Sequence, residues 1–187
     1  LEKHNSINSL IRKIVFYDER EKIYAKIKDC FSTGSMDYDG WSIEIKFGDA
    51  RKSVKELNAY IFDAVFHDPY SPSKNPELWT VEFFMEIKNL MREGAILTTY
   101  SSANQIRMAL AEAGFDIYKG PSVGKKREGT LASHGSTITG LEQIDILNLK
   151  TDIASIPYRD YYLKDTREEI ITRRITMKKA ARVKNLQ

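Results

Sequence analysis

One stretch of the chain combines residue types that can handle protons with a backbone stiffened by proline. Residues 62–79 read FDAVFHDPYSPSKNPELW, in which an apolar run ends at His67 and Asp68 and three prolines follow. A carboxylate held in place can orient a reacting group or take its proton, and proline fixes φ in the loop that carries it. A lone histidine at a strand end is more often packed or solvated than catalytic. The stretch therefore predicts Asp68 as a candidate site residue on a rigid loop.

Two further acidic residues occupy comparable positions. Asp49 follows the apolar stretch 41–47, and Glu2 opens the chain. Ligands of open α/β sheets bind beyond the carboxyl ends of the strands, so three acids at successive strand ends form a pattern that a single acid does not. The alternative for each is a helix cap or a solvated turn. For Asp49, directly before a helical stretch, the cap is as well supported as the site.

The elements that would position these acids alternate along the sequence. The expected strands cover residues 41–47, 61–67, 95–101, 115–120 and 129–134, and the expected helices between them cover residues 49–58, 76–91 and 102–114. This order indicates a parallel sheet with helices on its faces. Since only a short connection separates the last two strands, we expect them to form an antiparallel hairpin at one edge.

Caps and periodicity set the bounds of the expected helices. Asn75 is a good N-cap and Pro76 suits the first helical position, whereas Gly94 and Gly114 stand where helices end. The helix at 76–91 should turn one apolar stripe inward, comprising Leu78, Val81, Phe84, Met85 and Lys88.

The length of 187 residues suits one domain with a core of its own. A first helix is expected at 17–31. We expect the α/β domain to cover residues 1–137 and a differently organised extension to cover residues 138–187, loop-rich at first and helical near 166–181.

Composition excludes several classes of protein. No apolar run approaches the roughly 20 residues that a membrane helix needs, and the first residues do not form a signal peptide. Cys30 is the single cysteine, so neither an internal disulfide nor a thiolate metal cluster is expected. We predict no metal site and a reducing, cytoplasmic location.

Basic residues are concentrated in two places although the net charge is only +3. They lie in GKKREG, residues 124–129, and in TRRITMKKAARVK, residues 172–184. Such blocks can attract phosphate backbones. For the second block taken alone, a solvated helix face is the better-supported interpretation.

Three segments carry a resemblance to a known family. VFHDPYSPSKNPELWTVEFF at 65–84, LTTYSSANQIRMALAEAGF at 97–115 and GKKREGTLAS at 124–133 together resemble the methyltransferase domain of MnmC-like proteins, and SIPYRD at 155–160 is similar to the tail of that family. These are S-adenosylmethionine-dependent enzymes that complete the methylaminomethyl group on a tRNA wobble uridine. The resemblance implies a class I methyltransferase (Rossmann-like) sheet with an antiparallel last strand, plus a C-terminal helical tail.

The resemblance also implies roles in binding S-adenosyl-L-methionine. Glu2 would accept hydrogen bonds from the ribose hydroxyls. Asp49 and Ala50 would lie against the adenine, with the carboxylate accepting from its exocyclic amine. Asp68 would sit by the reactive centre and is the one residue expected to be catalytic, orienting the substrate amine and helping to take its proton.

Roles toward tRNA follow in the same way. Tyr70 would shape the pocket and stack near a flipped base, and Lys74 would be an anchor. The natural phosphate contacts are Lys125, Lys126 and Arg127.

One part of the family pattern is absent from the sequence. The glycine-rich cofactor loop that follows the first strand of such sheets does not occur, because the early glycines Gly34, Gly40 and Gly48 are not clustered. If Glu2 ends the second strand, the sheet is truncated at its N-terminal side and should show an apolar gap beside the neighbours of the missing strand. The chain is then a fragment, or is completed by an upstream segment or a second chain, or is a homologue that has lost cofactor binding; we favour the first two. No FAD site is expected.

Two functions of different classes therefore remain open. The first is a tRNA-modifying methyltransferase, favoured by HDPYSPSKNPELW. The second is a non-catalytic RNA-binding or assembly protein derived from the same fold, favoured by the absent glycine loop. A different α/β enzyme with a nucleotide-linked substrate is disfavoured, because neither phosphate-binding glycine motif is present.

Overall fold

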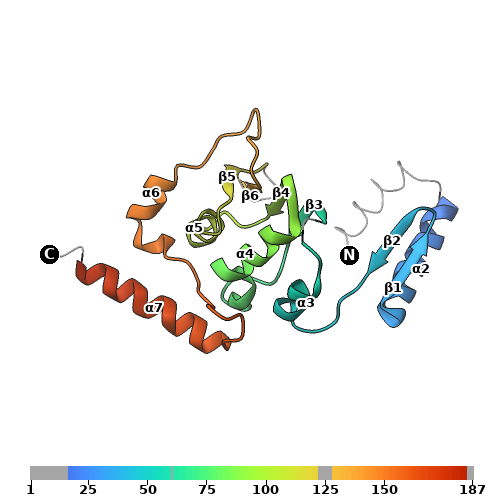
Figure 1. Cartoon of the computed structure of the whole chain (residues 1–187), viewed down its shortest axis with the longest axis horizontal. Coiled ribbons are helices and arrows are strands. Elements are labelled where there is room, and N and C mark those ends of the chain that lie inside the picture. The colour runs from blue at the N-terminus through green and yellow to red at the C-terminus, as the bar shows by residue number, and fades with distance from the viewer. Residues whose placement is uncertain (1–16, 60, 122–127, 185–187) are drawn as a thin grey trace. The chain divides into compact units, whose positions relative to one another are not determined.

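The structure, a computed structural model, describes residues 17–59, 61–121 and 128–184 (Figure 1). The chain divides into two compact units, Leu1–Gly48 and Asp49–Gln187.

The first unit contains a helix and a hairpin. The expected helix at 17–31 is confirmed as α2 (Tyr17–Thr33), and it is followed by the antiparallel strands β1 (Ser35–Tyr38) and β2 (Trp41–Glu44). Asp39 and Gly40 join the strands with φ of 48° and 79°, which are the signs that a two-residue type I′ turn requires. The prediction that residues 41–47 belong to the parallel sheet was therefore wrong. A tight Asp-Gly turn lets this segment satisfy its backbone locally.

The second unit is built on a mixed four-stranded sheet. Its strands lie in the order β3-β4-β6-β5, with bounds Phe62–His67, Met91–Thr99, Thr130–Ser133 and Asp116–Lys119 respectively. The pair β3 and β4 is parallel, and the remaining pairs are antiparallel. The expected hairpin of the last two strands is confirmed. Because β6 inserts between β4 and β5, the sheet is mixed rather than mainly parallel.

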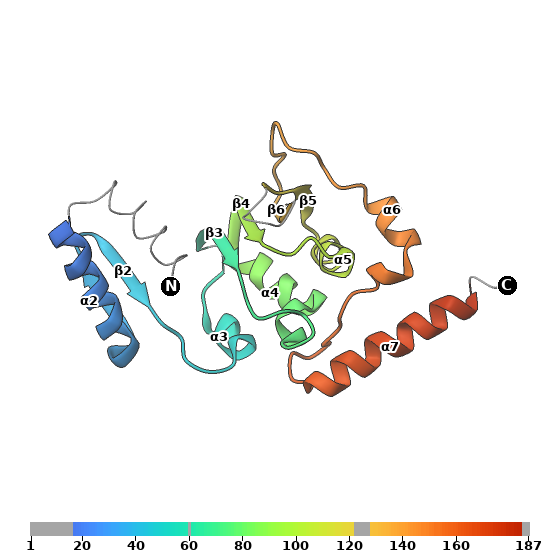
Figure 2. The same cartoon turned by 180° about the vertical axis from the view of Figure 1, so that it is seen from behind.

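Helices pack against this sheet, and in Figures 1 and 2 α7 lies on the outside of the unit beyond α4 and α6. The elements are α3 (Ala50–Glu56), η1 (Pro76–Trp79), α4 (Val81–Leu90), α5 (Asn104–Glu112), α6 (Ile146–Thr151), η2 (Ile153–Ser155) and α7 (Arg167–Lys184). Gly114, with φ of 87°, follows α5 as expected for a helix end. Gly94 was expected at a helix end but lies within β4.

The expected helix at 76–91 is divided by Thr80. The Thr80 hydroxyl accepts a hydrogen bond from the Phe83 backbone N–H at 3.2 Å, so α4 has its own N-cap. The inward stripe differs accordingly: Met85 is 49% exposed, and Lys88 donates to the Gly114 carbonyl. The buried face of α4 comprises Val81, Phe83, Phe84, Ile87 and Leu90.

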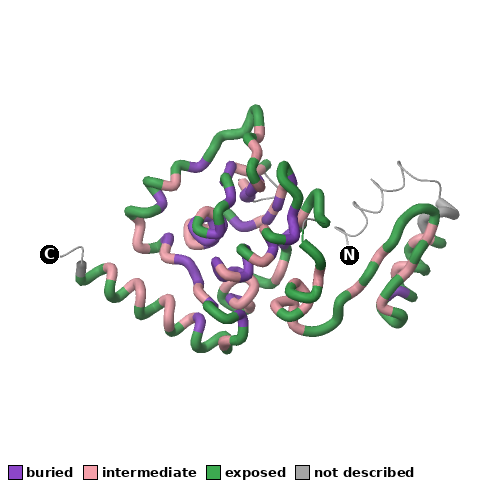
Figure 3. Tube along the Cα trace, in the orientation of Figure 1, coloured by how far each residue is buried: buried purple, intermediate pink, exposed green. Residues whose placement is uncertain are grey.

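The core of the second unit includes its C-terminal part (Figure 3). Trp79, Phe84 and Leu97 are fully buried between the sheet and α4 and α5. Residues after 138 join the same cluster through Ile144, Leu149, Tyr158, Leu163 and Ile170. Burial of apolar surface stabilises a fold by about 25 cal/mol per Å², so these side chains fix the C-terminal segment to the domain.

Strand β3 lies at one edge of the sheet in the part of the chain that the structure describes. Its Phe66 is 84% exposed, and Phe62 and Ala64 are exposed as well. Alternate residues of a strand point to the same face, so these side chains form an exposed apolar patch on one face of the sheet along β3. The apolar gap beside a missing strand, which the sequence predicted, stays a prediction.

Candidate active site

The candidate site lies where two parallel strands end. His67 at the end of β3 pairs with Thr99 at the end of β4, so Asp68 and Tyr100 leave the sheet at the same edge. An open hollow of about 440 Å³ lies at this edge. Its lining comprises Asp68, Pro69, Tyr70, Ser71, Asn75, Leu78 and Tyr100.

The loop that carries Asp68 is held by side chains from both sides. The Tyr100 hydroxyl donates to the Pro69 carbonyl at 3.1 Å, and the Trp79 indole N–H donates to the Tyr70 carbonyl at 2.8 Å. The Ser71 carbonyl accepts from the backbone of Lys74 and Asn75 within the loop itself. Loss of such a partner costs a buried donor about 1–3 kcal/mol. The loop therefore keeps one conformation, and the Asp68 carboxylate and the 77%-exposed Tyr70 ring stand at its surface.

His67 lies directly beneath this loop as part of the core. Its ring is 4.8 Å from the Trp79 ring and 5.1 Å from the Phe84 ring, both edge-to-face. Burial lowers the pKa of His67 to about 4, and a hydrogen bond to the backbone of Leu78 opposes that shift. The imidazole is consequently neutral and packs against aromatic rings. Its role is structural, as a lone histidine at a strand end predicts.

Tyr100 connects the loop to the charge of Asp68. Burial raises the pKa of the Tyr100 phenol, and the negative charge of Asp68 adds to the increase. The phenol thus keeps its proton and remains a donor to the Pro69 carbonyl. Asp68 and Tyr100 both line the hollow at this edge of the sheet.

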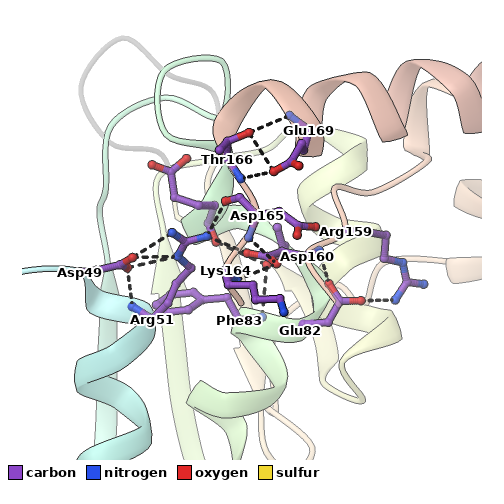
Figure 4. A network of polar contacts seen from close by, with 12 residues as sticks. Asp49, Arg51, Glu82, Phe83, Arg159, Asp160, Lys164, Asp165, Thr166 and Glu169 are labelled. Carbon is purple, nitrogen blue, oxygen red and sulfur yellow. Dashed lines mark hydrogen bonds and ion pairs between the residues drawn. The ribbon is translucent and has the colours of Figure 1, made fainter. Parts of the chain in front are cut away.

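Asp49 caps a helix and pairs with Arg51 (Figure 4). Its Oδ1 accepts from the Arg51 backbone N–H at 3.0 Å, and its Oδ2 lies 2.8 Å from Arg51 Nη2. The hydrogen bond from the Arg51 side chain is the main reason that the pKa of Asp49 is lowered. The helix cap that the sequence left open as an alternative is therefore present.

Arg51 joins Asp49 to the C-terminal segment. Its Nη1 lies 2.7 Å from Oδ2 of Asp160, a residue with no solvent exposure. The other Asp160 oxygen accepts from the backbone N–H groups of Lys164 and Asp165 at 3.0 and 3.2 Å. The backbone N–H of Asp160 donates to Glu82 on α4 at 2.8 Å (Figure 4). This network fixes the end of the SIPYRD segment against α3 and α4, and no residue pattern other than the resemblance pointed to it.

Arg107 forms a second polar junction. It is buried on α5 and lies 2.7 Å from Glu128 Oε1 and 3.1 Å from the Thr130 hydroxyl. Thr130 in turn donates to the Ser101 carbonyl at 2.7 Å. Arg107 thus holds the end of the basic segment before β6 against the end of β4.

The structure describes some of the remaining predicted site residues and not others. Ala50 is the first residue of α3 and packs against the core, and Lys74 is exposed on the loop after Asp68. Four predicted site residues lie outside the described residues: Glu2, Lys125, Lys126 and Arg127. Among the described residues, the structure brings Asp68 and Tyr70 together with Asn75 and Tyr100, which the sequence did not select.

Arg51 uses the acceptor positions of the Asp49 carboxylate. A carboxylate offers about four lone-pair positions, and Asp49 accepts four hydrogen bonds from Arg51, at Oδ1 from the backbone N–H and Nε and at Oδ2 from Nε and Nη2. An adenine amine would therefore compete with Arg51 for this carboxylate. Among the described residues, no group of three or more His, Cys, Asp or Glu side chains could hold a metal ion. No helix in the described ranges has the length and apolarity to cross a membrane.

Comparisons with known proteins give matches in both sequence and fold. A family model described as S-adenosyl-L-methionine-dependent methyltransferase matches residues 16–135. An uncharacterized protein of Methanocaldococcus jannaschii is 35% identical over 162 residues, which cover 83% of this chain and 45% of that protein. The tRNA 5-methylaminomethyl-2-thiouridine biosynthesis bifunctional protein MnmC of Pseudomonas entomophila is 38% identical over 105 residues, covering 56% of this chain and 16% of that protein.

A solved structure is similar over most of the chain. The crystal structure of MNMC2 from Aquifex aeolicus matches with a TM-score of 0.74 and 30% identity, covering 85% of this chain and 52% of that one. The chain thus spans about half the length, or less, of these three relatives.

Proposed function

Since the chain belongs to the S-adenosyl-L-methionine-dependent methyltransferase family and has an MnmC-like domain, we propose that it transfers a methyl group to the aminomethyl group of a wobble uridine in tRNA. The observation that carries the proposal is the acid at the end of β3 on a loop held by Tyr100 and Trp79. The printed name of the MnmC relatives, which refers to biosynthesis of 5-methylaminomethyl-2-thiouridine in tRNA, supports the choice of substrate. The reaction would take place in the cytoplasm.

Asp68 would prepare the nucleophile. An alkyl amine is mostly protonated at neutral pH and has no free lone pair in that form. The Asp68 carboxylate can accept hydrogen bonds from the ammonium, orient the nitrogen and help to remove its proton. When bound, S-adenosyl-L-methionine supplies the electrophilic methyl group on its sulfonium sulfur.

The loop would provide the fixed geometry that the reaction needs. Bond formation requires the nitrogen to approach the methyl carbon in line at about 3 Å, and a misplacement of about 1 Å can cost about 100-fold in rate. Two hydrogen bonds hold the carbonyls of Pro69 and Tyr70, the two residues that directly follow the acid. The exposed Tyr70 ring is placed to stack on an unpaired base.

Other predicted residues would bind the two substrates. Asp49 and Ala50 would contact adenine, and Glu2 would contact the ribose. The tRNA backbone would meet Lys74 and the group Lys125, Lys126 and Arg127. An upstream segment or a second chain would pair with β3, whose place at one edge of the described sheet supports a further strand at that position.

The first experiment separates binding from chemistry. Calorimetry with S-adenosyl-L-methionine and S-adenosylhomocysteine measures binding, and transfer of labelled methyl to aminomethyl-uridine tRNA measures turnover. We expect Asp68→Asn to lower turnover at least about 100-fold with cofactor binding kept. The matched control is Asp63→Asn, which removes an exposed carboxylate within β3 that pairs with Arg92 at the surface. Wild-type turnover by Asp68→Asn would remove Asp68 from the mechanism.

The competing function is that of a non-catalytic RNA-binding or assembly protein. The absence of a clustered glycine motif from the 187 residues favours it. It predicts that the chain binds tRNA while calorimetry detects neither cofactor. Micromolar binding of S-adenosyl-L-methionine would exclude that alternative.

A further inference from the structure

Helix α7 is attached to the domain along one side and mainly through its first half. Ile170 is fully buried, and Arg173 and Arg174 donate to backbone carbonyls of Arg159 and Ile156, both at 2.6 Å. Their guanidinium groups also lie over the rings of Tyr161 and Tyr158. These two arginines therefore attach α7 to the domain, and their guanidinium groups already have partners within the protein.

The second half of α7 has the opposite character. After Glu169 the remaining sequence contains no acidic residue. Lys179 and Arg182 are exposed, as are Ile175 and Val183, at 48% and 60%. At about 100° per residue, Lys179 and Arg182 point away from the side on which Ile170 is buried. The helix thus presents two cations to solvent on its outer face, with Lys178 beside them.

No ion pair within the described residues involves Lys179 or Arg182. The one ion pair of α7 in the described ranges is that of Arg173 with Asp165. Lys178 contributes to the lowered pKa of Asp152, after the backbone N–H of Ala154 and the side chain of Asn104. The helix dipole favours cations within the last turn, which accounts for Arg182 but not for the lysines one turn earlier.

The position of α7 relates this face to the candidate site. The helix contacts η1, which directly follows the Asp68 loop, and in Figures 1 and 2 its second half runs along the outside of the unit toward the C-terminus. The helix is about 27 Å long, so the cations of its second half lie at a distance from the site. An RNA with one nucleotide at the Asp68 hollow would extend over such a distance.

We propose that Lys179 and Arg182 form a docking surface for the phosphate backbone of the RNA substrate. The inference rests on the proposed tRNA substrate, and it adds a backbone contact outside the family motifs. Flexible lysine and arginine side chains without base-edge partners bind phosphates regardless of sequence. Among the described residues of α7, the exposed large apolar side chains are Ile175 and Val183, which is too little apolar surface for a helix that lies in a membrane interface.

The test measures the salt dependence of tRNA binding. Fluorescence anisotropy with a labelled, unmodified tRNA transcript gives Kd between about 50 and 300 mM salt for the wild type and for Lys179→Gln/Arg182→Gln. Each lost phosphate contact lowers the slope of log Kd against log[salt] by about 0.7–0.9, so we expect a decrease of about 1.4–1.8 for the double variant. If the affinities converge at about 1 M salt, Kd rises about 25-fold or more at about 0.1 M salt.

The matched control removes two lysines elsewhere in the same unit. Lys55 and Lys150 stand in the last turns of α3 and α6, so Lys55→Gln/Lys150→Gln changes the net charge equally and should keep the wild-type slope. Equal losses in both double variants would assign the effect to net charge and overturn the proposal. An unchanged slope in Lys179→Gln/Arg182→Gln would overturn it as well, and so would a loss of binding to anionic phosphatidylserine vesicles without a loss of tRNA binding.

Failure of this inference is distinguishable from failure of the proposed function. Methyl transfer by the wild type with an unchanged salt slope in the α7 variant would sustain the function and overturn the docking surface. If the wild type transfers no methyl group but the α7 variant shows a decreased slope, the docking surface is supported and the proposed reaction is refuted.

Discussion

Lowering the pH should decrease the stability of the fold through His67, which is buried beneath the candidate site. The imidazole is 7% exposed and lies against the rings of Trp79 and Phe84, and burial lowers its pKa from 6.5 to about 4. In the unfolded chain the same group takes up its proton near pH 6.5. Between pH 6.5 and pH 4 the unfolded state therefore binds more protons than the folded state, and the stability of the fold decreases as the pH falls through that window.

The size of the effect follows from the two pKa values. Linkage gives a loss of about 2 kcal/mol in the free energy of unfolding at about pH 5 relative to about pH 7.5. Domains of this kind are stable by about 5–15 kcal/mol, so the loss is large enough to measure. Protonation would also place an uncompensated charge beneath the loop that carries Asp68.

Urea unfolding followed by Trp79 fluorescence measures this loss. Trp79 contacts the His67 ring and belongs to the second unit, whereas the other tryptophan, Trp41, is exposed in the first. A Trp41→Phe background makes the signal specific, and His67→Phe in that background removes the titrating group while keeping an aromatic ring. The free energy of unfolding should then change less between about pH 7.5 and pH 5, by about 2 kcal/mol.

The reasoning would be refuted if the free energy of unfolding changed equally with pH in the Trp41→Phe protein and in the Trp41→Phe/His67→Phe protein. It would mean that the buried imidazole is hydrated or partnered in solution, so that folding does not change its pKa. His134→Gln is the matched control for loss of an imidazole, since His134 Nδ1 likewise lies near a backbone carbonyl, 3.1 Å from that of Met91.

Three further substitutions test the contacts that hold the site. Asp160→Asn should lower the free energy of unfolding by about 1.5–3 kcal/mol, because the fully buried carboxylate is lost and Arg51 keeps only Asp49 as an ion-pair partner; urea midpoints check this, and a change below about 1 kcal/mol would show that the pair behaves like a surface one. Gly129→Ala should cost about 1–3 kcal/mol, because its Cβ would lie 2.7 Å from the Thr99 carbonyl oxygen; an unaltered melting temperature by calorimetry would contradict that close approach. Tyr100→Phe should lower methyl transfer more than cofactor binding, because the Pro69 carbonyl loses its donor; equal losses in both would instead indicate general destabilisation.

Short-range patterns explain what could be predicted without the structure. The acid and prolines after residue 67, the glycine at the end of α5 and the hairpin of β5 and β6 depend on neighbouring residues, and each was predicted. The Asp39-Gly40 turn was equally local and was overlooked, which led residues 41–47 to be assigned to the wrong sheet. Thr80 could likewise have been identified as a cap from its type alone.

Contacts between distant residues explain the rest. Arg51 and Asp160 are 109 positions apart, and Tyr100 reaches the Pro69 carbonyl 31 positions away. Neither pairing leaves a periodicity or a spacing in the sequence, because each depends on which strands become neighbours and on where helices dock.

The candidate site shows the same division between local pattern and long-range contact. Neighbouring residues alone were enough to place an acid on a stiff loop. That Trp79 and Tyr100 hold this loop, and that His67 packs beneath it, became visible only in the folded molecule. Helix α7 likewise turns its cations outward because Ile170 is buried on its other side. Burial and pairing between distant residues exist only once the chain has folded, so no local pattern can encode them.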